Sequence, residues 1–369
     1  MVSSINNIMF NLDMLNKRSE KNTYGLSSGD ALQYGSDNSK QYNEILTVKN
    51  NVKSYTSILD KIQLSGAYND TSDSAASKMK DAVRSVQSLV MEALNGTTNS
   101  DVKEIIATNI ESKKETLFNL ANSSVNGQYV FSGKNTDSPA FEKGTDEKIT
   151  YVGSNDNKTI NVEDKTYAKQ GVNGIELLYT PSQSAKVGES LTFSTNEMIL
   201  DKDGNEYKLV DTNADGFVDS LNTPIPTSVT DNGDGTYTTS VSIALESKTS
   251  IFDTLDEIIY ALKQQDSNGN SITEDAANVI LSNSLTKIES AYDNVNLNHS
   301  ILGIRTSYID NYEQITEAKL TNFNILFENY SGADLTALAI ESQSLENTYT
   351  ALYSTINKIN NLSLVDYLK

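Results

Sequence analysis

Residues 338–359 read LAIESQSLENTYTALYSTINKI, and this stretch decides how the chain folds. Its apolar side chains are separated by seven, four, three, four and three residues, at Leu338, Leu345, Tyr349, Leu352, Ile356 and Ile359. Ser342 fills the one polar position of the repeat. Such heptad spacing places apolar side chains along one narrow stripe of a helix. The stretch therefore predicts a helix that must pack against another helix.

The opposite end of the chain carries a matching stripe. Its four apolar residues are spaced three, four and three apart. We expect the two stripes to pair as a coiled coil that is buried in an assembly; the predicted assembly interface is Ile5, Ile8, Leu12, Leu15, Leu345, Tyr349, Leu352, Ile356 and Ile359. Burying these side chains supplies on the order of 10 kcal/mol, and ordering the ends costs a similar amount. The ends should therefore be loose in a monomer and ordered in the assembly.

Proline divides the chain, because it breaks helices. All four prolines lie in the middle, at Pro139, Pro181, Pro224 and Pro226. Five segments follow from this distribution and from the terminal stripes. They are an N-terminal assembly segment (1–40), two halves of a helical stalk (41–138 and 251–333), a β-rich insert (139–250) and a C-terminal assembly helix (334–369).

Helical periodicity recurs on both sides of the insert. A loop is expected over residues 22–38, then helices over 42–62 and 75–90 and a third capped by Asp101. After the insert, the pattern resumes over 252–262 and runs almost unbroken from Thr273 to Tyr330; Asp334 is a suitable N-cap for the last helix.

The middle segment has the composition of a β domain. Short runs rich in β-branched and aromatic residues recur, and a strand is also expected over 128–133. Three Asp-Gly pairs, at 203–204, 215–216 and 234–235, supply the positive φ angles of tight hairpins. The predicted fold class is α+β: an elongated bundle of long helices from both chain ends, with an inserted all-β domain.

Composition excludes several functions. The formal net charge is −20, from 29 basic and 49 acidic residues, which argues against nucleic-acid and anionic-membrane partners. The chain has no Cys and one His (His299), so thiol catalysis and multi-His metal sites are excluded. No phosphate-binding glycine loop is present, and no catalytic residue or cofactor is predicted. The start lacks the pattern of a cleaved signal peptide, and no apolar run approaches a membrane span.

One segment resembles the start of a calcium loop. Asp211, Asn213, Asp215, Gly216 and Asp219 follow the D-x-N-x-D-G-x-x-D pattern. The twelfth position, usually a bidentate Glu, is Asn222, and no flanking helix is expected. Because Asp-Gly turns recur throughout the insert, a solvated turn is the favoured interpretation, and calcium at Asp211, Asn213, Asp215 and Asp219 is the alternative.

Three segments resemble the bacterial flagellin superfamily, and within it the hook-associated protein 3 type of hook–filament junction proteins. LSSG at 26–29, followed by SDN at 36–38, is similar to a segment near the start of that family. LANSSVNGQYVFSG at 120–133, followed by NTD at 135–137, is the most specific similarity because it is long and ordered. The ending LSLVDYL at 362–368 resembles the family's ending. The insert is not covered.

The resemblance implies a structural, non-enzymatic role in the flagellum. Such proteins are exported unfolded through the flagellar type III channel without cleavage, and they assemble in a tubular lattice with their terminal helices inside. Implied partners are neighbouring axial proteins (a second junction protein and flagellin), further copies of the chain and an export chaperone. Two alternatives stay open: a flagellin, or a surface adhesin or calcium-binding module acting through the insert. Deleting residues 139–250 separates the adhesin from the junction protein, because a junction protein should still join hook to filament whereas an adhesin would lose its activity.

Overall fold

The computed structural model describes residues 2–95, 99–145, 147–212, 218–222, 227–267 and 269–367, with side chains described from residue 6 to residue 358 of these ranges. The chain forms two compact units, one made of residues 1–59 and 314–369 and the other of residues 60–313. In the helices so described, no segment is long and apolar enough to cross a membrane.

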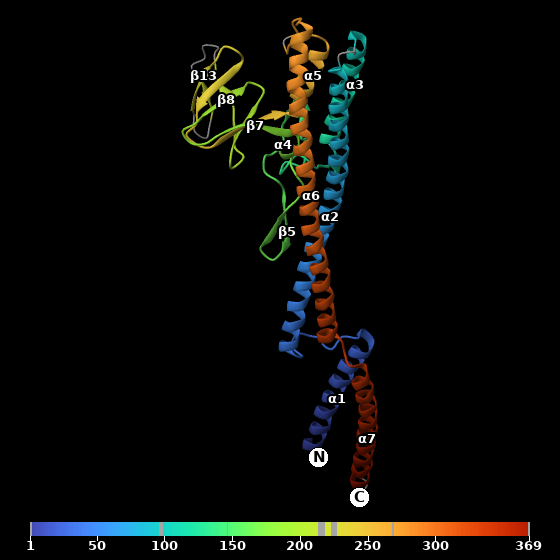
Figure 1. The fold of residues 1–369 in the computed structure, drawn as a ribbon. Coiled ribbons are helices and arrows are strands. Elements are labelled where there is room, and N and C mark those ends of the chain that lie inside the picture. Colours follow the sequence, from blue (N-terminus) through green and yellow to red (C-terminus); the bar gives the residue numbers. More distant parts are fainter. Residues whose placement is uncertain are drawn as a thin grey trace. The chain divides into compact units, whose positions relative to one another are not determined.

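Long helices come from both ends of the chain, as predicted (Figure 1). They are α1 (Val2–Ser28), α2 (Ser39–Ala93), α3 (Ser100–Ala121), α5 (Ile251–Leu262), α6 (Glu274–Ser331) and α7 (Leu335–Tyr367), and a short helix α4 covers Gly174–Leu178. A β-rich segment lies between α3 and α5, so the α+β class with a β-rich insert is confirmed. The unbroken helix expected up to Tyr330 is α6, and the helix at 252–262 is α5.

In the first unit, α1 and α7 lie side by side (Figure 1). Asp334 caps α7 as expected, since its Oδ1 accepts the Ala337 N–H at 2.9 Å. The prediction of a loop over residues 22–38 is wrong for its first part, because α1 continues to Ser28. A Cβ on Gly25 would lie 2.6 Å from Leu338 Cδ1, so glycine here permits close helix packing rather than a turn.

Helix α2 is one helix where two were expected. The predicted apolar seam stops at Ile62 and resumes at Ala75, yet the positions between them at helical spacing are filled by buried Ser65, Tyr68, Asn69 and Ser72. Small polar residues thus continue the packed face, which a search for apolar periodicity misses. The expected cap of α3 is also corrected: Asn99, not Asp101, accepts the Val102 N–H, at 2.9 Å.

Every strand pairing in the described insert is antiparallel. Three two-stranded pairs precede two larger sheets, whose orders are β10-β9-β15-β7 and β11-β12-β13-β14-β8. The strands are β1 (Ser124–Val125), β2 (Gln128–Tyr129), β3 (Phe141–Lys143), β4 (Ile149–Tyr151), β5 (Thr159–Glu163), β6 (Thr166–Lys169), β7 (Tyr179–Ala185), β8 (Ser190–Ser194), β9 (Met198–Asp201), β10 (Glu206–Tyr207), β11 (Leu209–Val210), β12 (Ser220–Leu221), β13 (Thr227–Asp231), β14 (Thr236–Ser240) and β15 (Leu245–Ser250).

Two of the Asp-Gly pairs lie at hairpins, as expected. Gly204 (φ 83°) is between β9 and β10, and Gly235 (φ 84°) is between β13 and β14. The third pair, 215–216, lies outside the described residues. The strand expected over 128–133 ends at Tyr129, because the chain then turns through Gly133 (φ 66°).

The second unit has two hydrophobic cores. The larger one joins α2, α3, α5 and α6 to the segment that follows β2, and it includes fully buried Phe131, Phe252 and Leu302. The smaller core lies inside the sheets, around Leu191 and Phe193. Helices α2 and α3 precede the insert, and α5 and α6 follow it. The larger core contains buried residues from both pairs, so both sides of the insert are needed to form it.

Candidate functional site

The two terminal stripes meet each other within one chain. Leu15 and Leu345 are buried, at 8% and 4% exposure. Half-buried along the same faces are Ile8, Leu12, Tyr349, Leu352 and Ile356. Ile5 and Ile359 lie outside the residues whose side chains are described. Seven of the nine residues therefore lie buried or half-buried on α1 and α7, and their role as an assembly interface stays a prediction.

Polar contacts fix the register of α1 against α7. The Tyr349 hydroxyl donates to Asn16 Oδ1 at 2.8 Å, and Arg18 forms an ion pair with Glu341. A backbone hydrogen bond joins the segment after α1 to the end of α6, because the Ala31 N–H donates to the Ser331 carbonyl at 2.7 Å. The exposed ion pair adds little free energy, so it specifies alignment more than it stabilises.

Several apolar side chains outside the seam remain exposed on the same helices. Phe10 and Met14 on α1 are 64% and 51% exposed, and Ile340 on α7 is 68% exposed. Phe10 lies about 200° around α1 from Ile8, on the side away from the seam. Sequence reasoning missed these residues because it followed only the heptad stripe. The signal that could have found them is the Phe10–Met14 pair at a spacing of four, displaced from the stripe.

A shallow groove of about 420 Å³ runs between α1 and α7. Four residues come from each helix, and they are mostly small, polar or aliphatic: Asn11, Met14, Leu15, Arg18, Thr348, Ala351, Leu352 and Thr355. No carboxylate lines it, although the chain is strongly acidic. The groove and the outer faces together form a surface suited to another apolar helix.

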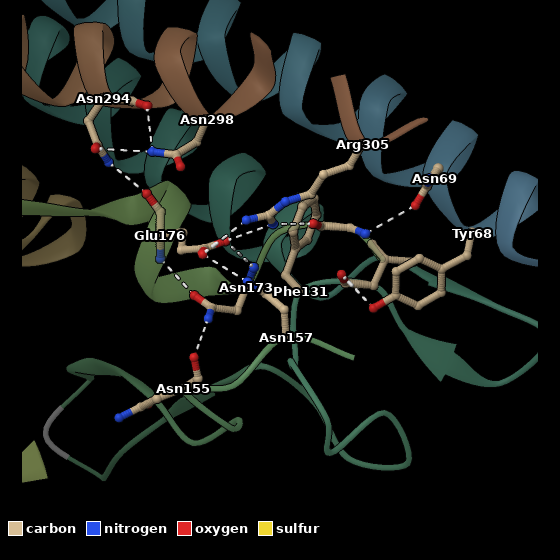
Figure 2. A network of polar contacts seen from close by, with 12 residues as sticks. Tyr68, Asn69, Phe131, Asn155, Asn157, Asn173, Glu176, Asn294, Asn298 and Arg305 are labelled. Atoms are coloured by element: carbon tan, nitrogen blue, oxygen red, sulfur yellow. Dashed lines mark hydrogen bonds and ion pairs between the residues drawn. The ribbon is translucent and has the colours of Figure 1, made fainter. Parts of the chain in front are cut away.

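Part of the segment that carries the family resemblance, residues 126–133, packs between α2 and α4; Figure 2 shows its Phe131. Val130 and Phe131 are fully buried. The Tyr68 hydroxyl from α2 donates to the Val130 carbonyl at 2.8 Å, and the Gly174 N–H donates to the Phe131 carbonyl at 2.8 Å. These hydrogen bonds connect α2 to the start of α4 through residues 130 and 131. In this fold the segment therefore has a structural role.

A network of polar contacts connects α6 to this segment and to α4 (Figure 2). Asn173 and Glu176 form a capping box at the start of α4. The Glu176 carboxylate also accepts from Asn157 Nδ2 at 2.8 Å and from the Arg305 guanidinium at 3.2 Å. Asn294 Nδ2 donates to the Glu176 carbonyl at 3.0 Å. These bonds hold α6 against the insert at one defined position.

The calcium candidate is only partly described. Asn213 and Asp215 lie outside the described residues, and Asp211 lies at their edge. Asp219 accepts hydrogen bonds from Thr212, with its Oδ1 3.0 Å from the Thr212 backbone nitrogen. Among the residues that the structure does describe, no group of three or more His, Asp or Glu is placed to hold a metal ion. The metal assignment stays a hypothesis.

His299 lies between the long helices. Its Nε2 is 2.9 Å from Asp73 Oδ1 and its Nδ1 is 3.4 Å from Lys80 Nζ. These contacts join α6 to α2, and no nucleophile is positioned by them. The arrangement has the geometry of an interhelical contact.

Asp253 is a half-buried acid beside a cavity of about 840 Å³ between α3, α5 and the insert. Burial, with a smaller contribution from Asp256, raises its pKa from 3.8 to about 6. A carboxyl whose pKa is raised on folding favours the folded state most when it is protonated. Its stabilising contribution is present below pH 3.8 and is lost as the pH rises through 6. At neutral pH the ionised group therefore lowers the stability of this unit.

Asp253→Asn should raise the free energy of unfolding at pH 7.5 by about 1–3 kcal/mol. The lower figure applies if the first turn of α5, where a negative charge is favourable, offsets part of the desolvation cost. The gain should disappear at pH 4. Urea unfolding at the two pH values measures it. Asp275→Asn, at an exposed first-turn position of α6, is the control and should give no such pH-dependent gain.

Comparisons with known proteins agree with this architecture. Residues 3–136 match the family described as the bacterial flagellin N-terminal helical region. Flagellar hook-associated protein 3 of Escherichia coli K12 is 27% identical over 161 residues, 43% of this chain and 45% of that protein. The protein of the same name from Salmonella typhimurium is 34% identical over 74 residues, 20% of this chain and 23% of that protein. The matches thus span less than half of each curated relative.

A solved structure reproduces the fold. The crystal structure of flagellar hook-associated protein 3 from Legionella pneumophila superposes with a TM-score of 0.54 at 16% identity, over 77% of this chain and 98% of that one. By class, then, residues 3–136 are similar to the flagellin N-terminal helical region, and they include most of α1 and all of α2 and α3. More particularly, its homologues are the proteins named flagellar hook-associated protein 3.

Proposed function

We propose that this chain is a structural protein of the bacterial flagellum that joins the hook to the filament. The observation that carries the proposal is the pairing of α1 with α7, which leaves apolar Phe10, Met14 and Ile340 on the outside. The names of the homologues support the same role. No catalytic step is proposed.

The mechanism is packing of helices in a lattice. Leu15 and Leu345 close the seam between α1 and α7, and the outer faces then bury against neighbouring subunits. Each apolar side chain that becomes buried contributes about 1.5–3 kcal/mol, so a few per subunit suffice to hold a multisubunit joint. Because the seam closes inside one chain, the interface offered to neighbours extends beyond the nine residues predicted from the sequence.

The partners follow from this position. They are neighbouring axial proteins on the hook and filament sides, and further copies of the chain in a tubular lattice. The chain would reach this place by export through the flagellar type III system without cleavage, held beforehand by an export chaperone. The proposed location is therefore extracellular, on the flagellum.

A strain that lacks the gene tests the proposal. We expect hooks to form normally while filament subunits leak into the medium, because the joint that retains them is missing. Electron microscopy of the cells and analysis of the culture supernatant measure both effects, and the restored gene should reverse them. Normal filaments on the deletion strain would refute a joining role. Hooks with no filament and no exported filament subunit would indicate a filament subunit instead.

A further inference from the structure

Asn126 and Gly127 form the tight turn between β1 and β2. Their φ angles are both positive, 51° and 77°, as in the type I′ turns that Asn-Gly favours. Both residues are exposed, and a Cβ placed on Gly127 would meet no atom within 4 Å. The turn is therefore accessible to water and uncrowded at Gly127.

The polar groups of this turn are free to react with each other. Among the residues that the structure describes, none forms a hydrogen bond with the Asn126 side chain or with the Gly127 N–H. A hydrogen bond on either group would hold it in place, so its absence lets the backbone nitrogen approach the carboxamide. Glycine favours this approach further, because it has no side chain and its backbone rotates easily.

A second Asn-Gly pair, at 173–174, is held on both sides. Asn173 is 2% exposed, and its Oδ1 accepts the Glu176 N–H at 2.7 Å. The Gly174 N–H donates to the Phe131 carbonyl at 2.8 Å. Neither the carboxamide nor the following nitrogen can move toward the other unless these bonds break.

A third pair, at 232–233, is exposed but also bonded. Asn232 Nδ2 donates to Thr236 Oγ1 at 2.9 Å and to Thr238 Oγ1 at 3.0 Å. The Gly233 N–H donates to Asp231 Oδ1 at 2.8 Å. Free hydrogen-bonding groups, and not exposure alone, thus distinguish Asn126. The pairs at 95–96 and 268–269 lie partly outside the described residues.

We propose that Asn126 is a spontaneous modification site, converted through a cyclic imide to aspartate and isoaspartate. The Gly127 nitrogen loses its proton and attacks Asn126 Cγ, so that a C–N bond forms, the Cγ–Nδ2 bond breaks and ammonia leaves. Water then adds to one ring carbonyl and breaks its bond to the ring nitrogen. Addition at Cγ gives aspartate, whereas addition at the backbone carbonyl gives isoaspartate. Water is the one co-reactant, and no electrons are transferred.

The modification changes the turn and leaves its surroundings in place. Aspartate adds a negative charge, and isoaspartate adds one carbon to the main chain at the turn. Beyond the turn, the Val130 N–H donates to the Ser123 carbonyl at 3.0 Å, and Val130 is fully buried. The hairpin therefore stays anchored, and a modified chain should keep its fold. This inference is independent of the proposed function.

Site-resolved mass spectrometry of the purified full chain tests the proposal. The chain is incubated at pH 7.5, and each Asn-Gly peptide is scored for aspartate and isoaspartate. Conversion at Asn126 should exceed that at Asn173 and Asn232 by at least about tenfold, because those two sites must first break hydrogen bonds. Conversion should accelerate at a more alkaline pH, since the reaction begins with loss of the Gly127 amide proton.

The same chain unfolded in guanidinium chloride is the matched control. Without structure, the three Asn-Gly peptides should convert at similar rates, since the hydrogen bonds that separate them are lost. Similar conversion at the three sites of the folded chain would overturn the proposal, and so would an equal preference for Asn126 in the denaturant. Aspartate without isoaspartate would also overturn it, because direct hydrolysis of the amide forms no ring.

Gly127→Ala gives a second readout in the folded chain. A Cβ beside the attacking nitrogen hinders its approach and restricts rotation of the backbone, so conversion at Asn126 should fall by at least about tenfold. Conversion at Asn173 and Asn232 should stay as in the wild type. An unchanged rate at Asn126 in Gly127→Ala would contradict attack by this nitrogen.

Discussion

Gly133→Ala should destabilise the second unit by at least about 3 kcal/mol. The residue has φ 66°, a conformation that costs a non-glycine residue about 1–2 kcal/mol. Space adds a larger cost, because a Cβ would lie 2.1 Å from the Ser154 carbonyl oxygen and 2.6 Å from that of Asp156. Both obstacles are backbone atoms, so the loop between β4 and β5 must move to relieve the contact.

The same stretch provides a matched control. Gly127 also has a positive φ, 77°, but a Cβ there would meet no atom within 4 Å. Gly127→Ala should therefore show the backbone cost alone, about 1–2 kcal/mol. Urea unfolding followed by circular dichroism compares the two variants with the wild type. Equal losses in both would show that the fold tolerates the displaced loop and that Gly133 is not a tight contact.

Gly133 also shows where sequence reasoning reaches its limit. The family resemblance covers residues 120–133, and the sequence predicts a strand that ends at Gly133. Gly133 cannot be replaced without strain because the carbonyl oxygens of Ser154 and Asp156 lie close to it. Nothing in the local sequence indicates this contact. The Arg305–Glu176 pair is similar, because its partners are 129 residues apart and no local pattern indicates that they meet.

Periodicity predicted what depends on apolar contacts at short range. It located α6 and α7 because their inner faces repeat over many turns. It divided α2 in two because Ser65, Asn69 and Ser72 are buried among apolar neighbours. It ends α1 too early because Gly25 is typical of a loop, although glycine there lets Leu338 pack closely. In each miss, tertiary packing overrode a local preference.

At the α1–α7 site, too, the sequence predicted some residues and missed others. The heptad stripes predicted which faces of α1 and α7 meet, since that contact follows from spacing. Phe10, Met14 and Ile340 lie outside the heptad stripes, and the spacing of Phe10 and Met14 is the only local signal for them, so their exposure follows from the way α1 and α7 pair. The heptad stripe explains how α1 and α7 pair within one chain. The apolar side chains outside the stripe stay exposed, and these are the ones that neighbouring subunits can bind.

Leu345→Ala should separate α7 from α1. Among the described side chains of these two helices, Leu15 and Leu345 are the apolar ones that are buried. Truncating a buried leucine costs about 2–5 kcal/mol, which is a large share of the energy of so thin an interface. Hydrogen exchange of the α1 amides around Leu15 measures the effect on the partner helix. Their protection should fall by on the order of 30-fold or more, because every 1.4 kcal/mol corresponds to about tenfold.

The control removes the same atoms from an exposed position. Leu335 begins α7 and is 52% exposed, so Leu335→Ala should leave the protection of α1 unchanged. In cells, Leu345→Ala should also fail to retain filaments, because α1 and α7 can present their outer faces to neighbours only while they are paired. Retained filaments together with lost protection would show that the lattice itself closes the seam. If α1 of the dilute wild-type chain already exchanges like an unfolded peptide, the two ends are loose before assembly, as the sequence alone predicts, and the expectation for Leu345 is wrong.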